Sequence, residues 1–235
     1  MELTTRVLFG SLQHILPILL TIVLGFAVIL YAKNKHESIQ IQVFKLLGFF
    51  VTGVMVVFHG YQISKGGYSL QTDLPLFLCS FMALFIVTFT ATRRFVLFEF
   101  LVFWVIIGTT QGVITPEIEV GFPSFDYFRY WVVHLGLILI IAYAIVVFKM
   151  KPNLKSVVKS FIGLQVYLLI LMGINKLLDA NYGYLNQKPK SATILDYFGE
   201  WPTYVITAQL ILIPAFFLIY FPFFLVSKKN KNAVN

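Results

Sequence analysis

Seven long apolar stretches constrain this chain more than any other feature. A helix crosses the hydrocarbon region of a bilayer with about 20 mainly apolar residues. Stretches of about this length occupy residues 11–31, 41–60, 74–90, 95–114, 130–148, 157–178 and 203–226. Lipid offers no partner to unpaired backbone groups, so helices are the expected form. The sequence therefore predicts an all-α, polytopic membrane bundle of seven transmembrane helices that forms a single domain over residues 1–235.

Composition supports the membrane assignment. The chain is 59% hydrophobic and only 12% charged, which is too apolar for a soluble protein of 235 residues. The first stretch continues through Leu30-Tyr31-Ala32-Lys33 with no small-x-small cleavage pattern. We therefore expect a retained first helix rather than a cleaved signal peptide.

Basic residues in the connections predict the orientation. Most of the 18 lysines and arginines lie in the connections near residues 33–45, 93–94, 149–159 and 228–231, whereas most acids lie at the opposite ends of the stretches. Because positive loops stay in the cytoplasm, we expect the N-terminus outside and the C-terminus inside, in the cell membrane. The charges are split among short loops, which argues against nucleic-acid binding. The single cysteine excludes an intramolecular disulfide.

Polar residues inside the apolar stretches gather in the halves predicted to face outward. They are His14, His59, Cys79, Gln111, Thr115, His134, Asn175 and Trp201. Polar groups at membrane depth are costly and by default suggest a functional site. The exception is Glu99 on the inner side, which we expect to reach toward Arg93 and Arg94 at the interface.

The outer connections are longer than the inner ones and richer in proline, glycine and aromatic residues. The longest runs from about residue 179 to Pro202 and contains Asn181, Tyr182, Tyr184 and Tyr197. Long ordered loops are often functional lids. An aromatic belt at the membrane surface accounts for the tyrosines equally well. The sequence leaves both interpretations open.

Cys79 and His134 form the leading candidate pair for chemistry. A cysteine nucleophile needs a thiolate, and a nearby imidazole can accept the thiol proton. The alternatives are a small cysteine that eases helix packing and a histidine that makes an interhelical hydrogen bond. Ser80 lies about 100° around the helix from Cys79, so we expect it to face elsewhere.

Two other interpretations of the polar cluster are open. His14, His59, His134 and Cys79 are possible ligands for a metal or haem, but their spacing matches no recognised metal motif. We therefore predict no metal and no cofactor. Gln111, Thr115, Asn175 and Asn181 are candidate donors to an oxyanion or a lipid headgroup, or they are interhelical hydrogen-bond partners.

The chain resembles the YwaF-like family of integral membrane proteins in four blocks. The first is Leu74-Pro75-Leu76-Phe77-Leu78-Cys79, and the second is Gln111-Gly112-Val113-Ile114-Thr115-Pro116. The others are Phe122-Pro123 leading through Phe125 and Tyr127 to His134, and Asn175 with Asn181-Tyr182-Gly183-Tyr184-Leu185, Lys188-Pro189 and Gly199-Glu200-Trp201-Pro202. The blocks extend from the third stretch to the seventh.

The resemblance implies a seven-helix domain and a distant relation to an animal phospholipid acyltransferase that depends on a cysteine and a histidine. The matching positions here are Cys79 and His134. This sequence departs from the family pattern at Phe77, where a polar residue is expected, and at Glu200 before Trp-Pro. Both departures bear on substrate choice.

Two hypotheses about function follow. The first is a lipid acyltransferase or lipid-ester hydrolase at the outer membrane boundary, with a thioester on Cys79, His134 as base, and phospholipids or another fatty-acyl lipid as substrate. Gln111, Thr115, Asn175, Asn181, His14, His59 and Trp201 are then supporting or substrate-binding residues. The second is a seven-helix protein that binds or moves a lipid or small hydrophobic ligand without covalent chemistry. The sequence does not reveal the oligomeric state.

Overall fold

The computed structural model describes residues 6–232, and helices are the only regular secondary structure in that range. The long helices are α1 (Leu12–Lys33), α2 (Glu37–Ser64), α6 (Phe125–Val146), α7 (Leu154–Leu178) and α8 (Thr203–Asn232). A further helix runs from α4 (Phe95–Trp104) through the π-helical turn η1 (Val105–Thr109) into α5 (Thr110–Ile114). Within the described range, these 6 helices are long and apolar enough to cross a membrane. The prediction of an all-α, polytopic membrane bundle is confirmed.

The remaining elements are short. α3 (Leu78–Thr92) is an apolar helix of 15 residues, shorter than the other six. The 3-10 helices η2 (Tyr182–Tyr184) and η3 (Ile194–Phe198) lie in the long connection between α7 and α8.

The third helix begins later than the sequence suggested, at Leu78 rather than at residue 74. Proline disfavours a helical conformation in the residue before it, and Pro75 has this effect on Leu74. Side chains also bind this segment's backbone: the Leu74 N–H donates to the Tyr182 hydroxyl at 2.9 Å, and the Tyr167 hydroxyl donates to the Leu76 carbonyl at 2.5 Å. Cys79 consequently lies in the first turn of α3.

The fifth helix begins earlier than predicted, at Phe125 rather than at residue 130. Ser124 caps it by accepting a hydrogen bond from the Tyr127 N–H at 3.0 Å. Its first turns contain the charged pair Asp126 and Arg129, joined by hydrogen bonds of 3.0 and 2.5 Å. These charges lowered the hydropathy of a segment that is nevertheless helical.

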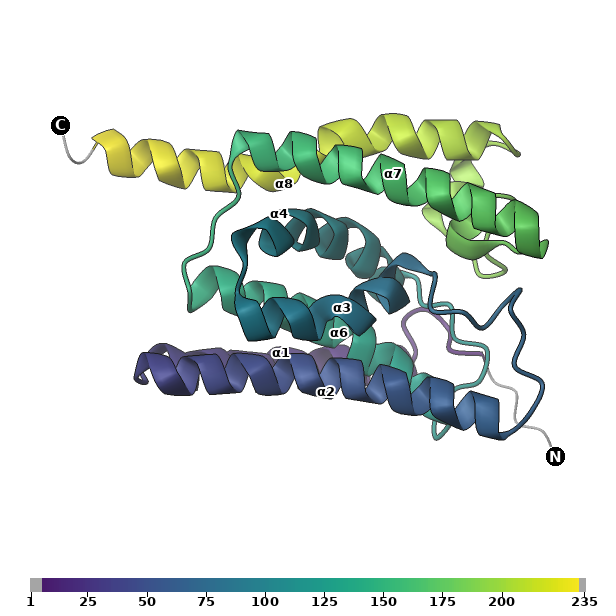
Figure 1. The fold of residues 1–235 in the computed structure, drawn as a ribbon, viewed down its shortest axis with the longest axis horizontal. Coiled ribbons are helices and arrows are strands. Elements are labelled where there is room, and N and C mark those ends of the chain that lie inside the picture. The colour runs from purple at the N-terminus through teal and green to yellow at the C-terminus, as the bar shows by residue number, and fades with distance from the viewer. Residues whose placement is uncertain (1–5, 233–235) are drawn as a thin grey trace.

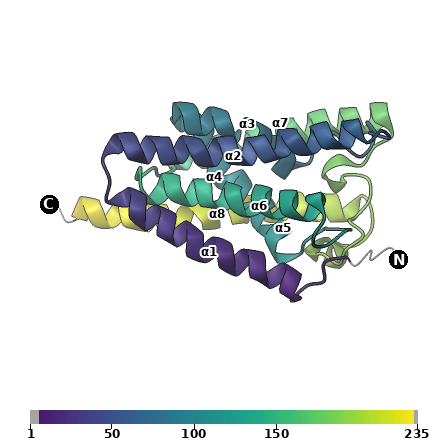
Figure 2. The ribbon, with the colours of Figure 1, turned by 90° about the horizontal axis from the view of Figure 1, so that it is seen from below.

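The helices form three layers, as Figure 1 shows. α1 and α2 lie on one side, α7 and α8 lie on the other, and α3, α4 and α6 lie between them. The view turned by 90° shows α1 diverging from α2 along its length (Figure 2). The middle layer contains the most buried side chains, including Phe98, Phe103, Val133 and Tyr143. The start of α1 and the last turns of α8 lie at opposite ends of the bundle (Figure 1).

Large apolar side chains on α1, α2 and α8 point outward, which suits a lipid environment. Within the bundle, α2 and α3 approach closely where Gly48 faces Thr90. A Cβ atom built on Gly48 would lie 1.9 Å from the Thr90 Oγ1 atom.

The prediction for Glu99 is wrong. Its carboxylate is 1% exposed and contacts α7 rather than Arg93 or Arg94. It accepts hydrogen bonds from the Ser156 hydroxyl at 2.7 Å and from the Lys159 ammonium at 3.0 Å. Because α4 packs against α7, this pairing satisfies the carboxylate without a movement to the interface.

Candidate functional site

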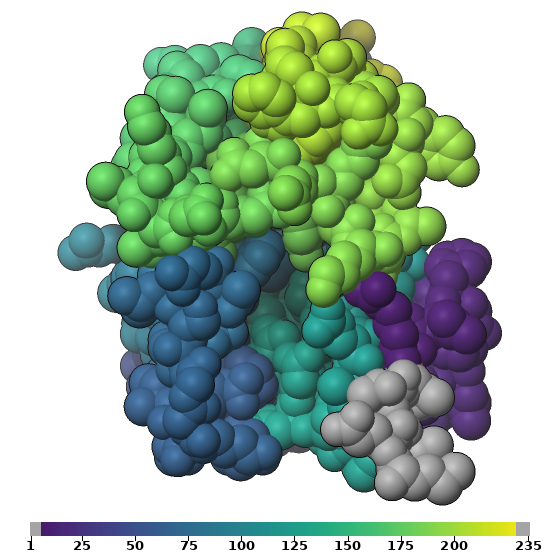
Figure 3. All heavy atoms as spheres, turned by 90° about the vertical axis from the view of Figure 1, so that its right-hand side faces the viewer, coloured from purple at the N-terminus to yellow at the C-terminus, as the bar shows by residue number. Residues whose placement is uncertain are grey.

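A cavity of about 460 Å³ opens at the end of the bundle where the long connections lie. It is bordered by the start of α3, the α4–η1–α5 helix, α6, α7, α8 and the connection after α7. The space-filling view of this end shows a hollow between the connection after α7 above and the segments near α3 and α6 below (Figure 3). The connection thus covers part of the mouth.

Cys79 borders this cavity from the first turn of α3 and is partly exposed. Its Sγ atom lies 3.9 Å from the Thr109 Oγ1 atom, a weak hydrogen-bond contact. Thr109 is the last residue of the π-helical turn, where the Thr110 N–H donates to the Val105 carbonyl five residues earlier. Such turns occur frequently at functional sites.

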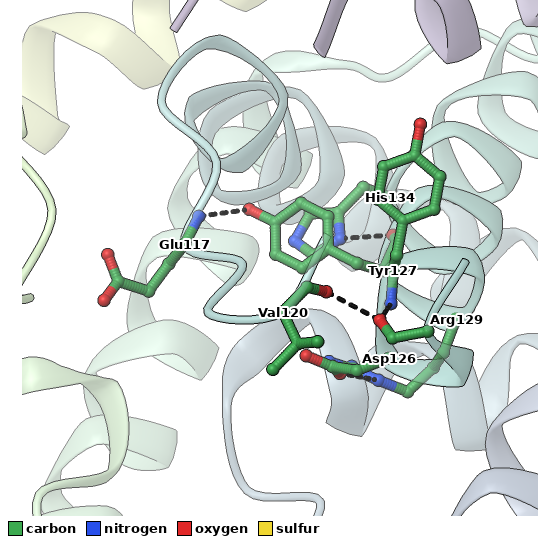
Figure 4. A network of polar contacts seen from close by, with 8 residues as sticks. Glu117, Val120, Asp126, Tyr127, Arg129 and His134 are labelled. Carbon is green, nitrogen blue, oxygen red and sulfur yellow. Dashed lines mark hydrogen bonds and ion pairs between the residues drawn. The ribbon is translucent and has the colours of Figure 1, made fainter. Parts of the chain in front are cut away.

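His134 borders the same cavity from α6, and its tautomer follows from its partner. The Nδ1 atom lies 2.8 Å from the Tyr130 carbonyl oxygen. A carbonyl only accepts, so Nδ1 carries the proton and Nε2 carries the lone pair of the neutral ring. The Tyr130 ring stacks on the imidazole with centroids 3.9 Å apart. Figure 4 shows His134 with the hydrogen bond of its ring nitrogen as a dashed line.

Gly112 on α5 lies against the edge of the His134 ring that carries Cδ2 and Nε2. A Cβ atom built there would lie 2.7 Å from the imidazole Cδ2 atom and 2.8 Å from Nε2. Only glycine leaves the imidazole room at this approach.

Cys79 and His134 therefore meet one face of the same helix. Thr109 and Gly112, their respective neighbours, are three residues apart, about 4.5 Å along the axis. No hydrogen bond joins Cys79 to His134 in the part of the chain that the structure describes. Direct proton transfer between the two side chains requires a rotamer change or a bridging hydroxyl group.

Gln111 and Thr115 also border the cavity. The Gln111 amide donates to the Thr115 hydroxyl at 3.0 Å, and that hydroxyl donates to the Gln111 carbonyl at 3.2 Å. Ser80 borders the cavity as well, contrary to the expectation that it faces elsewhere. The cavity spans enough of the α3 surface to include both neighbours.

Several polar residues at the mouth were not anticipated from the sequence. The Tyr130 hydroxyl donates to the Gly112 carbonyl at 2.8 Å and accepts from the Glu117 N–H at 3.2 Å. Figure 4 marks the second of these bonds at the Glu117 nitrogen. The Glu117 carboxylate pairs with Arg6 and accepts from the Ser191 N–H at 3.0 Å. These contacts connect the segment before α1, α5 and the connection after α7.

Arg129 and Tyr184 complete the mouth. The Arg129 guanidinium pairs with Asp126 and lies over the Phe58 ring at 4.6 Å. Burial, reinforced by the nearby Glu117 carboxylate, raises the pKa of Tyr184 above its usual range, so its hydroxyl is protonated at neutral pH. The signal in the sequence that points to Tyr130 is its hydroxyl-bearing side chain at the start of the fifth apolar stretch.

Asn175, Asn181 and Trp201 lie outside the cavity lining and hold the connection after α7. Asn175 clamps Tyr182, donating to its carbonyl at 2.9 Å and accepting from its N–H at 2.8 Å. Asn181 accepts from the Gln187 N–H at 3.0 Å, and the Trp201 indole donates to the Leu185 carbonyl at 3.0 Å.

His14 and His59 also lie outside the lining. His14 accepts from the Gly10 N–H at 2.8 Å and donates through Nε2 to the Val113 carbonyl at 2.9 Å. His59 contacts the Tyr68 hydroxyl at 3.0 Å. Since that hydroxyl donates to the Asp73 carbonyl at 2.7 Å, the His59 Nδ1 atom is the donor.

The four possible metal ligands do not converge. Among residues 6–232 the structure contains no group of three or more His, Cys, Asp or Glu side chains that could hold a metal ion. Of the three membrane histidines considered, only His134 borders the cavity that contains Cys79.

Comparison with known proteins identifies the family but no close relative. No curated protein and no solved structure matched the chain. A family model described as the TMEM164 family matches residues 8–220. That range includes Cys79, His134 and all the residues that border the cavity. Because the match covers most of the sequence, this multi-pass membrane protein belongs to the TMEM164 family.

Proposed function

We propose that the protein transfers fatty-acyl groups from a membrane lipid, with Cys79 as nucleophile and His134 as general base. The observation that carries this proposal is that both side chains border one cavity and approach the same helix face about one turn apart. The surrounding sequence blocks resemble the YwaF-like family, and the distant relation of that family to an animal cysteine-dependent acyltransferase adds support.

The tautomer of His134 suits the role of base. With Nδ1 donating to the Tyr130 carbonyl, Nε2 carries the lone pair at the ring edge beside Gly112, a residue that also borders the cavity. Tyr130 positions the imidazole through this bond and through ring stacking. A base held in one orientation by a second group is the usual arrangement for activating a nucleophile.

In the first half of the reaction, Nε2 accepts the Cys79 proton and the sulfur attacks the ester carbonyl of a lipid. The C–O bond breaks, the imidazolium returns its proton to the leaving alkoxide, and a thioester remains on Cys79. In the second half, Nε2 accepts a proton from the acceptor hydroxyl, which attacks the thioester. The C–S bond breaks and the proton returns to the thiolate.

The identity of the acceptor decides between two reactions. A lysolipid or another lipid alcohol gives transfer, whereas water gives hydrolysis. The predicted orientation would present the mouth at the outer face of the cell membrane, near the ester groups of phospholipids. An apolar interior suits the hydrocarbon part of such a substrate.

The test uses the purified protein and the p-nitrophenyl ester of a saturated fatty acid. We expect wild type to gain one acyl group on Cys79 by intact mass, which neutral hydroxylamine removes. Cys79→Ala should gain none, and His134→Ala should react about 100-fold more slowly. The control is His36→Ala, a change of an exposed histidine between α1 and α2, which should react like wild type. Equal acylation of wild type and Cys79→Ala would contradict the proposal.

Non-covalent lipid binding is the second candidate, favoured by the lack of a hydrogen bond between Cys79 and His134 in the described residues. It predicts that a photoreactive lipid labels the cavity equally in wild type, Cys79→Ala and His134→Ala, with no hydroxylamine-sensitive adduct in any of them.

A further inference from the structure

Beyond Cys79 the cavity continues as an apolar arm between α4, α7 and α8. The arm is bordered by Leu78, Trp104, Ile107, Leu164, Leu168, Ala208, Leu212 and Phe216. On α8, the cavity residues run from Tyr204 at the mouth to Phe216, about 18 Å along the helix axis. An apolar space of this kind fits part of a hydrocarbon chain.

One polar side chain, Gln209, also borders the arm from α8. Its Oε1 atom accepts a hydrogen bond from the Gln165 amide on α7 at 2.9 Å. The pairing satisfies the amide oxygen and joins the two helices that form one wall of the arm. A hydrocarbon chain in the arm would therefore pass an amide oxygen that already accepts a hydrogen bond.

Aromatic side chains close the deep end of the arm. Phe216 is 1% exposed and stacks on Phe103 with ring centroids 5.1 Å apart and an interplanar angle of 4°. The edge of a third ring, Phe161, lies against it at 5.8 Å. The Trp104 indole is fixed by donating to the Ser160 carbonyl at 3.1 Å. These contacts make the end of the arm rigid.

On α4, α7 and α8, the residues that border the cavity end at a similar depth in the bundle. Among the described residues, no position deeper than Trp104 on α4, Leu164 on α7 or Phe216 on α8 borders the cavity. Thr109, beside Cys79, lies about 7.5 Å above Trp104 along the same helix. The space below the sulfur is therefore short, and Phe216 blocks its extension along α8.

We propose that Phe216 is the end-stop that limits the length of the acyl chain held below Cys79. The inference rests on the proposed function for the presence of an acyl group on the sulfur. Phe216 is a specificity-determining residue, because each further methylene buried beyond its position would require the ring to move. Shortening the side chain opens the arm, and enlarging it shortens the arm.

The chain provides a matched control. Phe217, the next residue on α8, is 47% exposed and does not border the cavity. Phe217→Ala removes the same number of atoms from the same helix without lengthening the arm.

The experiment gives purified protein an equimolar series of p-nitrophenyl esters that differ only in the length of a saturated acyl chain. The masses of the acyl groups on Cys79 report which chain is preferred. Room for two more buried methylenes favours the longer ester by about tenfold. We expect Phe216→Ala to shift preference toward longer chains by this factor, Phe216→Trp to shift it toward shorter ones, and Phe217→Ala to match wild type.

A second measurement separates the end-stop from the chemistry. A fatty acid with a photoreactive diazirine at its terminal carbon should label residues at the Phe216 level in wild type and in Cys79→Ala. Labelling there without any acyl-Cys79 would support the end-stop and overturn the proposed acyl transfer. Acyl-Cys79 with one chain-length preference in all four proteins would overturn the end-stop alone. If neither labelling nor acylation is observed, both proposals are overturned.

Discussion

At the scale of single residues, the site depends on a glycine that lies beside the imidazole ring of a histidine. Gly112 leaves room for the His134 ring, and the Tyr130 carbonyl fixes which ring nitrogen holds the proton. Sequence reasoning selected Cys79 and His134 by residue type and by predicted depth. It did not find Tyr130 or Arg129, because the side of a helix that a polar residue faces depends on packing rather than on spacing.

Gly112→Ala should impair chemistry more than folding. The added Cβ would lie 2.7 Å from the His134 ring and force it to move. A displacement of about 1 Å at a catalytic group can reduce the rate about 100-fold. We expect that loss in the acylation rate of Cys79, with thermal unfolding measured in parallel.

Gly173→Ala on α7 is the control for this change, since a Cβ built there meets nothing within 4 Å. It should acylate at the wild-type rate. A Gly112→Ala protein that reacted as fast as the control would show that the position of His134 does not matter for the reaction.

At the scale of elements, two of the three glycines of α2 allow contrasting predictions. Gly48 packs against Thr90 of α3, and a Cβ there would overlap the hydroxyl oxygen. Overpacking costs about 1–3 kcal/mol, so Gly48→Ala should lower the midpoint of thermal unfolding. Gly53 has open space around its Cβ position. Gly53→Ala should leave stability unchanged or raise it by about 0.5–1 kcal/mol, and equal effects of the two changes would contradict this account of α2–α3 packing.

The clamp between Asn175 and Tyr182 fixes the connection over the cavity to the end of α7. Asn175→Ala leaves the buried N–H and carbonyl of Tyr182 without these partners, which should cost about 1–3 kcal/mol for each group. We expect faster proteolysis within residues 179–202 and a lower unfolding midpoint. Asn181→Ala, which removes bonds to exposed backbone of the same segment, should have a smaller effect.

At the scale of the whole molecule, hydropathy predicted the number of helices and their order along the chain. Two of the boundaries that it misplaced, the starts of α3 and α6, have clear physical reasons. Pro75 and hydrogen bonds from Tyr167 and Tyr182 keep the residues before Leu78 out of the helix. The Asp126–Arg129 pair allows charged residues within the first turns of α6. Neither contact is visible in a hydropathy pattern, because each depends on a specific partner.

The predicted orientation has a direct test at this scale. Most basic residues lie in the connections at the end of the bundle to which the C-terminus belongs. A fluorescent protein fused after Asn235 should therefore be active inside the cell, whereas an alkaline phosphatase fused there should be inactive. The opposite pattern would place the mouth of the cavity on the cytoplasmic side.

The π-helical turn at Val105–Thr109 explains how one helix can pack against α7 in its first part and border the cavity in its second part. It inserts an extra residue into a turn, and one residue corresponds to about 100° of rotation in an α-helix. The apolar pattern of α4 therefore continues into α5 with an angular offset. That offset directs Gln111, Gly112 and Thr115 to the cavity, although α4 below them packs against α7. Removing one residue from this turn would rotate the site-bearing residues away while preserving the hydropathy and nearly the length of the helix.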